Sequence, residues 1–213
     1  VKMELVEGPS YFPYPPLFAK EYGEKIQALL ELYPWEIQLT QLNLLDSHDT
    51  ARLISIAGGD KATVQLATLL LFTFPGAPSI YYGDEVGLEG QLDPDCRRAF
   101  PMKESWHQDV LDYHKKLIAI RHHYAALRIG SYKILYAKGI VYGFARCLDQ
   151  EELIIFVNSG TEPAHINFKV TQLKTCPNRL IYGEGKFSWK QEEDRTELEV
   201  YLPPRQGLIL ANS

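Results

Sequence analysis

Hydrophobic and polar positions follow a helical period in the first part of the chain. Residues 17–33 carry apolar side chains three and four positions apart, which predicts an amphipathic helix that ends before Pro34. The same spacing predicts helices over residues 61–74 and 108–127. The proline-rich stretch 8–16 is predicted to be a loop, because proline removes a backbone donor and restricts the chain.

Two short apolar runs lie between these helices, at residues 42–45 and 79–82, and each gives way abruptly to polar residues. Such runs are typical of strands buried on both faces of a parallel sheet. The alternation of helix and strand predicts parallel strands with crossover helices, as in a (β/α) barrel or an open doubly wound sheet. Two strands cannot close a barrel.

The pattern changes after Gly130 to short runs that alternate and are separated by turn residues, which predicts an antiparallel β-sandwich. The predicted strands cover residues 132–136, 140–146, 153–158, 165–170, 198–202 and 207–210. No flexible linker separates the two parts, so we expect them to pack closely near residues 128–131.

Composition and charge narrow the classes of partner. The 213 residues carry a formal net charge of -5 without long runs of one sign, which argues against nucleic acid and anionic membrane as partners. The longest apolar segment, residues 64–74, is too short to cross a bilayer. Three cysteines in no metal-ligand spacing predict reduced thiols, a cytoplasmic location and no metal site.

Candidate chemistry lies where the two predicted strands end, because functional groups of α/β folds gather at that edge. Residues 46–49 follow the first strand, and a polar loop over residues 83–98 follows the second. A purely local interpretation also exists for each site: Asp46 or Asp49 caps a short helix near residue 50, and residues 84–85 form a charged turn.

Three ordered motifs resemble the α-amylase family of glycoside hydrolases. Residues 43–50, NLLDSHDT, resemble its seventh barrel strand, and residues 79–87, SIYYGDEVG, resemble its eighth. Residues 93–98, DPDCRR, resemble its neopullulanase, cyclomaltodextrinase and maltogenic amylase branch. The resemblance implies the C-terminal portion of a (β/α)8 (TIM) barrel over residues 1–128, followed by an antiparallel β-sandwich over residues 129–213.

The resemblance also implies roles for single residues. Asp49 is implied to be the carboxylate that stabilises the transition state, and His48 is implied to donate to the same sugar ring. Asp93 and Arg97 are implied to bind the next glucose unit. Nothing before residue 40 resembles the family's nucleophile or general acid, and because the chain begins at Val1 we expect it to be excised from a longer protein.

The implied substrate is an α-glucan or maltooligosaccharide with α-1,4 or α-1,6 bonds. The implied partner is the missing N-terminal part of the barrel, and the isolated chain is expected to be inactive and to self-associate, with a homo-oligomer as one form. No cofactor is expected; calcium in this family is commonly bound upstream. Two alternatives stay open: a non-catalytic sugar-binding or interaction module, and an isomerase or phosphorylase on the same scaffold.

Overall fold

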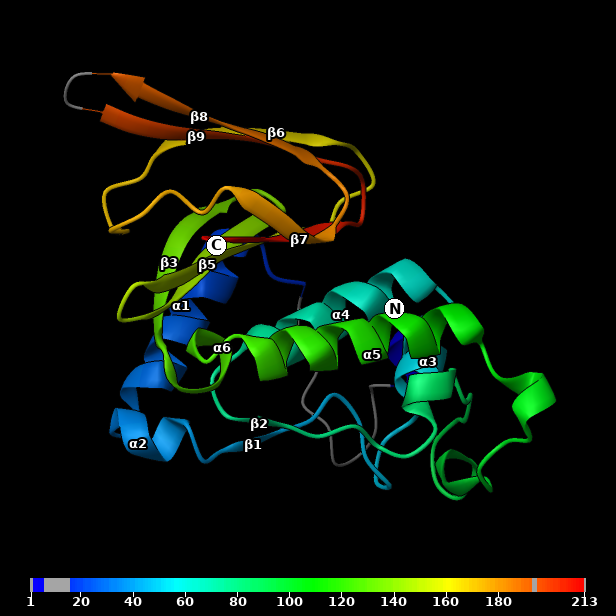
Figure 1. The fold of residues 1–213 in the computed structure, drawn as a ribbon. Coiled ribbons are helices and arrows are strands. Elements are labelled where there is room, and N and C mark those ends of the chain that lie inside the picture. The colour runs from blue at the N-terminus through cyan, green and yellow to red at the C-terminus, as the bar shows by residue number, and fades with distance from the viewer. Residues whose placement is uncertain (1, 6–15, 193–194, 213) are drawn as a thin grey trace.

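The computed structural model describes residues 2–5, 16–192 and 195–212. Most of the predicted loop at residues 8–16 lies outside this range. The described chain forms a helical part, which includes one pair of short strands, and a part built from two antiparallel sheets (Figure 1). No helix among the described residues is long and apolar enough to cross a membrane.

The predicted helices of the first part are present. The helices are α1 (Ala19–Glu31), α2 (Trp35–Gln38), α3 (Leu53–Ile56), α4 (Lys61–Thr73), α5 (Gln108–His123) and α6 (Ala126–Ile129), with 3-10 turns at Met3–Leu5, Asp84–Val86, Asp95–Arg97 and Lys103–Ser105. The helix predicted over residues 108–127 divides into α5 and α6, with Tyr124 in an extended conformation between them. Asp60 caps α4 as its carboxylate accepts from the backbone N–H of Ala62 at 3.1 Å.

The two strands of this part pair in parallel, as predicted, but they are shorter than expected. β1 (Leu42–Asn43) pairs with β2 (Ala77–Pro78), so the second strand precedes the predicted residues 79–82. The prediction that β1 is buried on both faces is wrong for this chain, because Leu42 is 65% and Leu44 49% exposed. Among the described residues β1 has β2 as its neighbour and no further strand covers its other edge.

Eight strands form the second part, in two sheets. They are β3 (Ser131–Lys138), β4 (Val141–Leu148), β5 (Glu151–Asn158), β6 (Ala164–Lys169), β7 (Arg179–Gly183), β8 (Lys186–Glu192), β9 (Arg195–Leu202) and β10 (Gly207–Ala211). One sheet has the order β3-β4-β5-β10-β7 and the other β6-β9-β8, all antiparallel, which confirms the predicted sandwich.

The sequence prediction missed β7 and β8. In β8 the side chains of Phe187 and Trp189 pack toward the core, while Lys186, Ser188 and Lys190 are exposed. This is the alternation of a strand with one buried face, so the period-2 signal was present in the sequence. β7 has no such alternation, because its sequence RLIYG places three apolar residues in succession.

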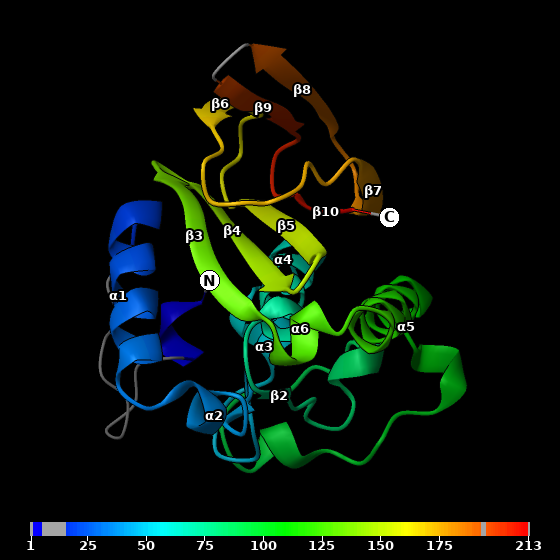
Figure 2. The same cartoon turned by 60° about the vertical axis from the view of Figure 1, so that its left-hand side comes forward.

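The larger sheet is buried on both faces. On one face Ile154 and Phe156 of β5 pack against Leu198 and Val200 of the smaller sheet. On the other face the neighbouring residue of β5, Ile155, packs into a core shared with α4 and α5. Figure 2 shows α1 along β3 and α4 beneath the sheet. The hydrophobic core therefore continues across the predicted domain boundary near residue 128. The division of the chain into two domains at that position stays a prediction.

Arg146 of β4 connects the two parts. Its side chain is fully buried, and its guanidinium donates to the backbone carbonyls of Thr73 (2.6 Å), Leu127 (2.9 Å) and Gly130 (2.9 Å). Thr73 is the last residue of α4, whose final carbonyls have no partner within the helix. Burial lowers the pKa of Arg146 to about 9, so the group stays charged at neutral pH.

Arg121 of α5 donates to carbonyls at the same end of α4, within the helical part. It donates to the carbonyls of Phe72 (2.7 Å), Leu127 (2.8 Å) and Gly76 (2.5 Å). Both guanidinium groups thus share the carbonyl of Leu127 and satisfy the C-terminal end of α4. The contact between the helical part and the sandwich is therefore a hydrogen-bonded joint within an apolar core.

We expect Arg146→Met to lower the free energy of unfolding by about 3 kcal/mol, because the buried carbonyls of Thr73 and Gly130 lose the guanidinium that donates to them. Urea unfolding followed by circular dichroism measures the change. Arg128→Met makes the same change in charge at an exposed position of α6 and should shift the midpoint little. Equal effects of the two substitutions would contradict the role given to Arg146.

Candidate functional site

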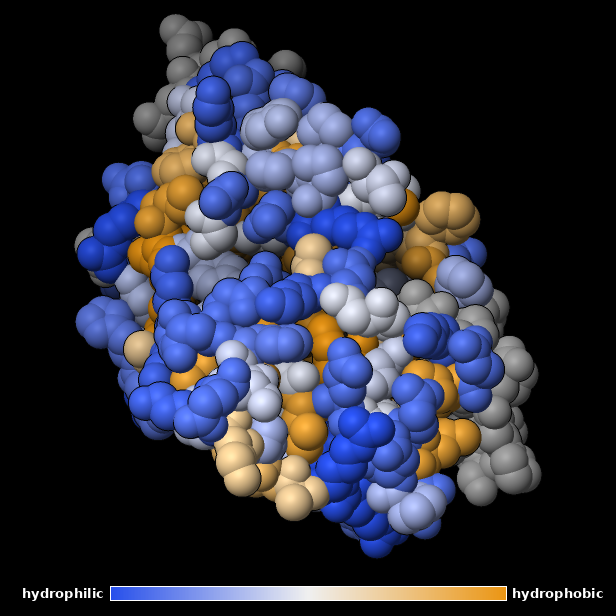
Figure 3. Space-filling view, turned by 90° about the vertical axis from the view of Figure 1, so that its right-hand side faces the viewer, coloured by the Kyte–Doolittle hydropathy of each residue, from blue (hydrophilic) through white to orange (hydrophobic). Residues whose placement is uncertain are grey.

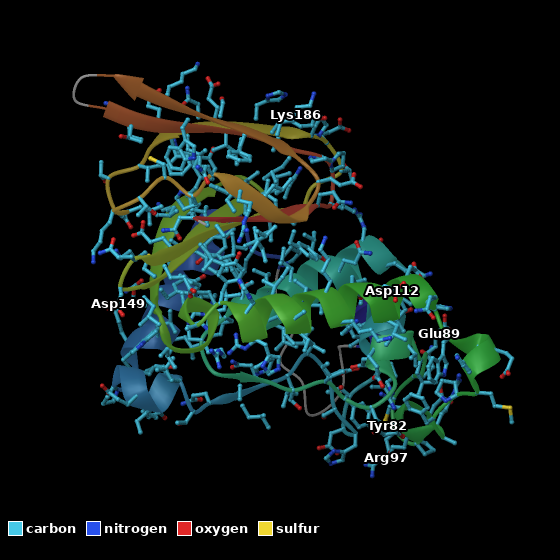
Figure 4. The ribbon with its side chains drawn as sticks, in the orientation of Figure 1. Tyr82, Glu89, Arg97, Asp112, Asp149 and Lys186 are labelled. Carbon is cyan, nitrogen blue, oxygen red and sulfur yellow. The ribbon has the colours of Figure 1, made fainter. Side chains whose placement is uncertain are left out.

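The candidate site lies where the chain leaves β1 and β2. Because the two strands are parallel, their carboxyl ends meet at one edge, and the loops 44–52 and 79–98 start there. Figure 4 shows Tyr82 and Arg97, both from the second loop, at the end of the molecule opposite Lys186 of the smaller sheet. The site is therefore remote from the outer face of the sandwich.

The structure brings together all four residues that the sequence analysis singled out. The Nε2 atom of His48 lies 3.2 Å from Oδ1 of Asp49, and an Nη2 atom of Arg97 lies 3.6 Å from the same oxygen. Arg97 Nε lies 2.6 Å from Oδ1 of Asp93. Arg97 therefore bridges two carboxylates that come from different loops.

These four side chains are open to solvent. Asp49 is 68% and Arg97 48% exposed, so the ion pairs between them are screened and contribute little to folding. A polar cluster of donors and acceptors that stays accessible is suited to binding a ligand rich in hydroxyl groups. Phe100 and Met102 add exposed apolar surface after the same loop, and Figure 3 shows apolar patches separated by hydrophilic side chains on one face of the molecule.

Short-range hydrogen bonds hold the first loop. The backbone N–H of Ser47 donates to Oγ1 of Thr50 at 2.8 Å, and the N–H of Asp49 donates to Oγ of Ser47 at 3.1 Å. Asp46 turns inward, where its Oδ2 accepts from the N–H of Leu53, the first residue of α3, at 2.8 Å. The local interpretation is thus correct for Asp46, while Asp49 points toward the cluster.

The second loop is held by a pair of its own residues. Arg98 donates to both oxygens of Asp95, at 2.7 and 2.8 Å, and the N–H of Gln91 donates to Asp95 at 2.7 Å. Hydrogen bonding from Arg98 lowers the pKa of Asp95. At Gly90 a side chain would lie 2.8 Å from the carbonyl oxygen of Asp95, so the tight return of the loop requires glycine.

Sequence reasoning missed the groups beneath the cluster, Arg52 and Asp84. Both are buried, and Arg52 Nη1 lies 3.4 Å from Oδ1 of Asp84. The pKa of Asp84 is raised to about 9 by burial, reinforced by the adjacent carboxyl of Asp46. Residues 84–86 do form a turn, and within it burial and the carboxyl of Asp46 raise the pKa of Asp84 against the attraction of Arg52.

A weak sequence signal for Arg52 existed: it is the one charged residue in the run ARLISIA that follows the first loop. Among the described residues no group of three or more His, Cys, Asp or Glu side chains is placed to hold a metal ion. Cys96, Cys147 and Cys176 are free thiols. The location predicted from them stays a prediction.

Two family models match the chain: the α-amylase catalytic domain over residues 16–116 and the α-amylase C-terminal domain over residues 130–210. The chain belongs to the α-amylase family. The fold expected from the three motifs, part of the family's barrel followed by a β-sandwich, is thereby confirmed.

Individual α-amylase-family proteins are similar over almost the whole chain. The cyclomaltodextrinase of Geobacillus thermopakistaniensis is 34% identical over 94% of the chain, and neopullulanase 2 of Thermoactinomyces vulgaris is 30% identical over 95%. The chain spans about a third of the length of each, 34% in both cases.

Solved structures of the α-amylase family agree with this relationship. The debranching enzyme of Nostoc punctiforme superposes on the whole chain with a TM-score of 0.94 and 58% identity, and the chain covers 44% of it. The cyclic α-maltosyl-(1→6)-maltose hydrolase of Arthrobacter globiformis has a TM-score of 0.75 and 29% identity over 92% of the chain. These relatives are glycoside hydrolases, and this chain corresponds to part of such an enzyme.

We expect Asp84→Asn to flatten the dependence of stability on pH. The folded-state pKa of about 9 exceeds the value of an unfolded aspartate, about 3.9, so the folded state holds an extra proton between these limits. Stability therefore falls as pH rises through this window, by about 1.4 kcal/mol per pH unit, and the amide, which cannot ionise, removes that slope.

Urea unfolding at pH 5.5, 6.5 and 7.5 measures this slope for each variant. Asp95→Asn is the control, because the pKa of Asp95 is lowered and its contribution is lost only as pH falls below that of an unfolded aspartate. Parallel curves for the original chain and the Asp84→Asn variant would show that Asp84 is ionised in the folded state.

Proposed function

We propose that this chain supplies the glucose-gripping half of the active site of a retaining α-glucan hydrolase or transglycosidase. The observation that carries the proposal is the cluster of His48, Asp49, Asp93 and Arg97 at the carboxyl ends of two parallel strands. Cyclomaltodextrinase, neopullulanase and debranching enzyme, named among the similar proteins, cleave bonds of this kind and support the same substrate class.

Asp49 has the role of stabilising the transition state in this proposal. As the glucose ring acquires oxocarbenium character, its 2- and 3-hydroxyls become more acidic and bind a fixed carboxylate more tightly. The gain is realised in the transition state and amounts to several kcal/mol, an order-of-magnitude figure. His48 and Arg97, at 3.2 and 3.6 Å from Oδ1 of Asp49, hold the carboxylate in place.

Arg97 and Asp93 bind the neighbouring glucose unit. Their 2.6 Å contact presents guanidinium donors and carboxylate acceptors side by side, which suits the vicinal hydroxyls of a sugar. A neutral substrate also agrees with the exposed, nearly balanced charges of the cluster. Neither residue transfers a proton in this proposal.

The nucleophile and the general acid come, in this proposal, from barrel segments outside this chain. A retaining glycosidase needs two carboxyl groups about 5 Å apart on either side of the scissile bond. The similar proteins are about three times as long as the matched region, which leaves room for these segments. The exposed Leu42 of β1 and Leu44 just after it would then be covered by the remainder of the barrel.

The second candidate is a sugar-binding module without catalysis. It is favoured by the accessibility of the cluster, since Asp49 is 68% exposed and already aligned with Arg97. The two candidates differ in one respect. A binding module retains maltooligosaccharide affinity and releases no sugar, whatever segment precedes it.

We expect Asp49→Asn, made in the longer protein that contains this chain, to lower kcat by about 10² to 10⁴-fold with a smaller change in KM, because the lost interaction belongs to the transition state. Release of reducing sugar from maltoheptaose, β-cyclodextrin and pullulan measures it. Asp112→Asn, an exposed carboxylate on α5 bound to Gln108, is the matched control. Undiminished kcat in the Asp49 variant would refute the assigned role.

A further inference from the structure

Arg52 is the last residue of the loop that carries Asp49, and its side chain contacts the loop that carries Arg97. Its side chain is fully buried, its Nε donates to the carbonyl of Cys96 at 2.7 Å, and its Nη1 donates to the carbonyl of Tyr82 at 2.5 Å. The guanidinium carbon also lies 3.8 Å from the ring centre of Tyr81 and 4.5 Å from that of Tyr82. One planar group thus binds backbone and aromatic faces together.

The two loops meet at Cys96. Its thiol donates to the carbonyl of His48 at 3.3 Å, while its own carbonyl accepts from Arg52. The backbone N–H of Arg52 donates to the carbonyl of Gly90 at 2.9 Å, which adds a third link to the second loop. Since Cys96 precedes Arg97 and His48 precedes Asp49, these contacts fix the separation of the two cluster residues.

The guanidinium of Arg52 interacts mainly with backbone carbonyls and with the rings of Tyr81 and Tyr82. The carboxylate oxygen of Asp84 lies farther away, at 3.4 Å from Nη1, and Nη2 of Arg52 has no hydrogen-bond partner among the described residues. Lysine would place a point charge here, without the planar fork that reaches Cys96 and Tyr82 at the same time. The site therefore requires the shape of arginine as well as its charge.

We infer that Arg52 is a positioning residue that locks the loop carrying Asp49 against the loop carrying Arg97. It touches no substrate. Its consequence for catalysis rests on the proposed function, whereas its effect on the two loops is a property of this chain. The two can be measured separately.

Thiol labelling measures how tightly the two loops are held together, and it requires no enzymatic activity. Cys96 is fully buried between the loops, whereas Cys147 and Cys176 lie in the sandwich and are partly exposed. In Arg52→Lys we expect the rate of Cys96 alkylation by iodoacetamide, followed by peptide mass spectrometry, to rise about tenfold or more through local opening. The rates at Cys147 and Cys176 should stay as in the original chain.

Arg128→Lys makes the same chemical change at an exposed position and should leave all three rates unchanged. Unaltered labelling of Cys96 in Arg52→Lys would overturn the inference. A parallel rise at all three cysteines would also overturn it, because that result indicates a general loss of stability.

In the longer protein, Arg52→Lys should lower kcat for maltoheptaose about 10 to 100-fold with little change in KM, as expected when a transition-state group is displaced. An unchanged kcat together with faster labelling of Cys96 would overturn the catalytic consequence. If the unsubstituted longer protein released no sugar, the proposed function would fail while the labelling result for Arg52 stood.

Discussion

Hydrogen bonds from buried guanidinium groups to backbone carbonyls are the interaction on which this structure depends. Arg121 and Arg146 satisfy the carbonyl end of α4 and share the carbonyl of Leu127, and Arg52 connects the two loops of the candidate site. A buried carbonyl without a donor is costly, and a planar group with five donors can satisfy several at once. Both the joint between the two parts and the site beneath the cluster use this solution.

The site itself follows from the topology. Parallel pairing of β1 with β2 brings two carboxyl ends to one edge, and the loops that leave them carry His48 and Asp49 on one side and Asp93 and Arg97 on the other. Buried contacts of Arg52 and Cys96 support an exposed, charged cluster. The side chains that would bind a ligand therefore stay hydrated, and the cost of desolvation falls on the buried residues beneath them.

Much of this could be predicted from the sequence. Periodicity gave the long helices α1, α4 and α5, and the three motifs gave the family and the four residues of the cluster. β8 was missed although Phe187 and Trp189 alternate with polar residues, and β7 has no such pattern. The burial of Arg52 and Asp84 could not be predicted, because it depends on partners 30 or more positions away.

The central claim is that this chain is one half of a catalytic site. It agrees with the exposed Leu42 and Leu44 at β1 and just after it, and with the absence of further barrel strands among the described residues. The most direct test is complementation. The chain is mixed with the separately produced remainder of the barrel, and sugar release from maltoheptaose is measured. The account predicts no release by either piece alone and release by the mixture that Asp49→Asn abolishes. Release by this chain alone, dependent on Asp49, would contradict it.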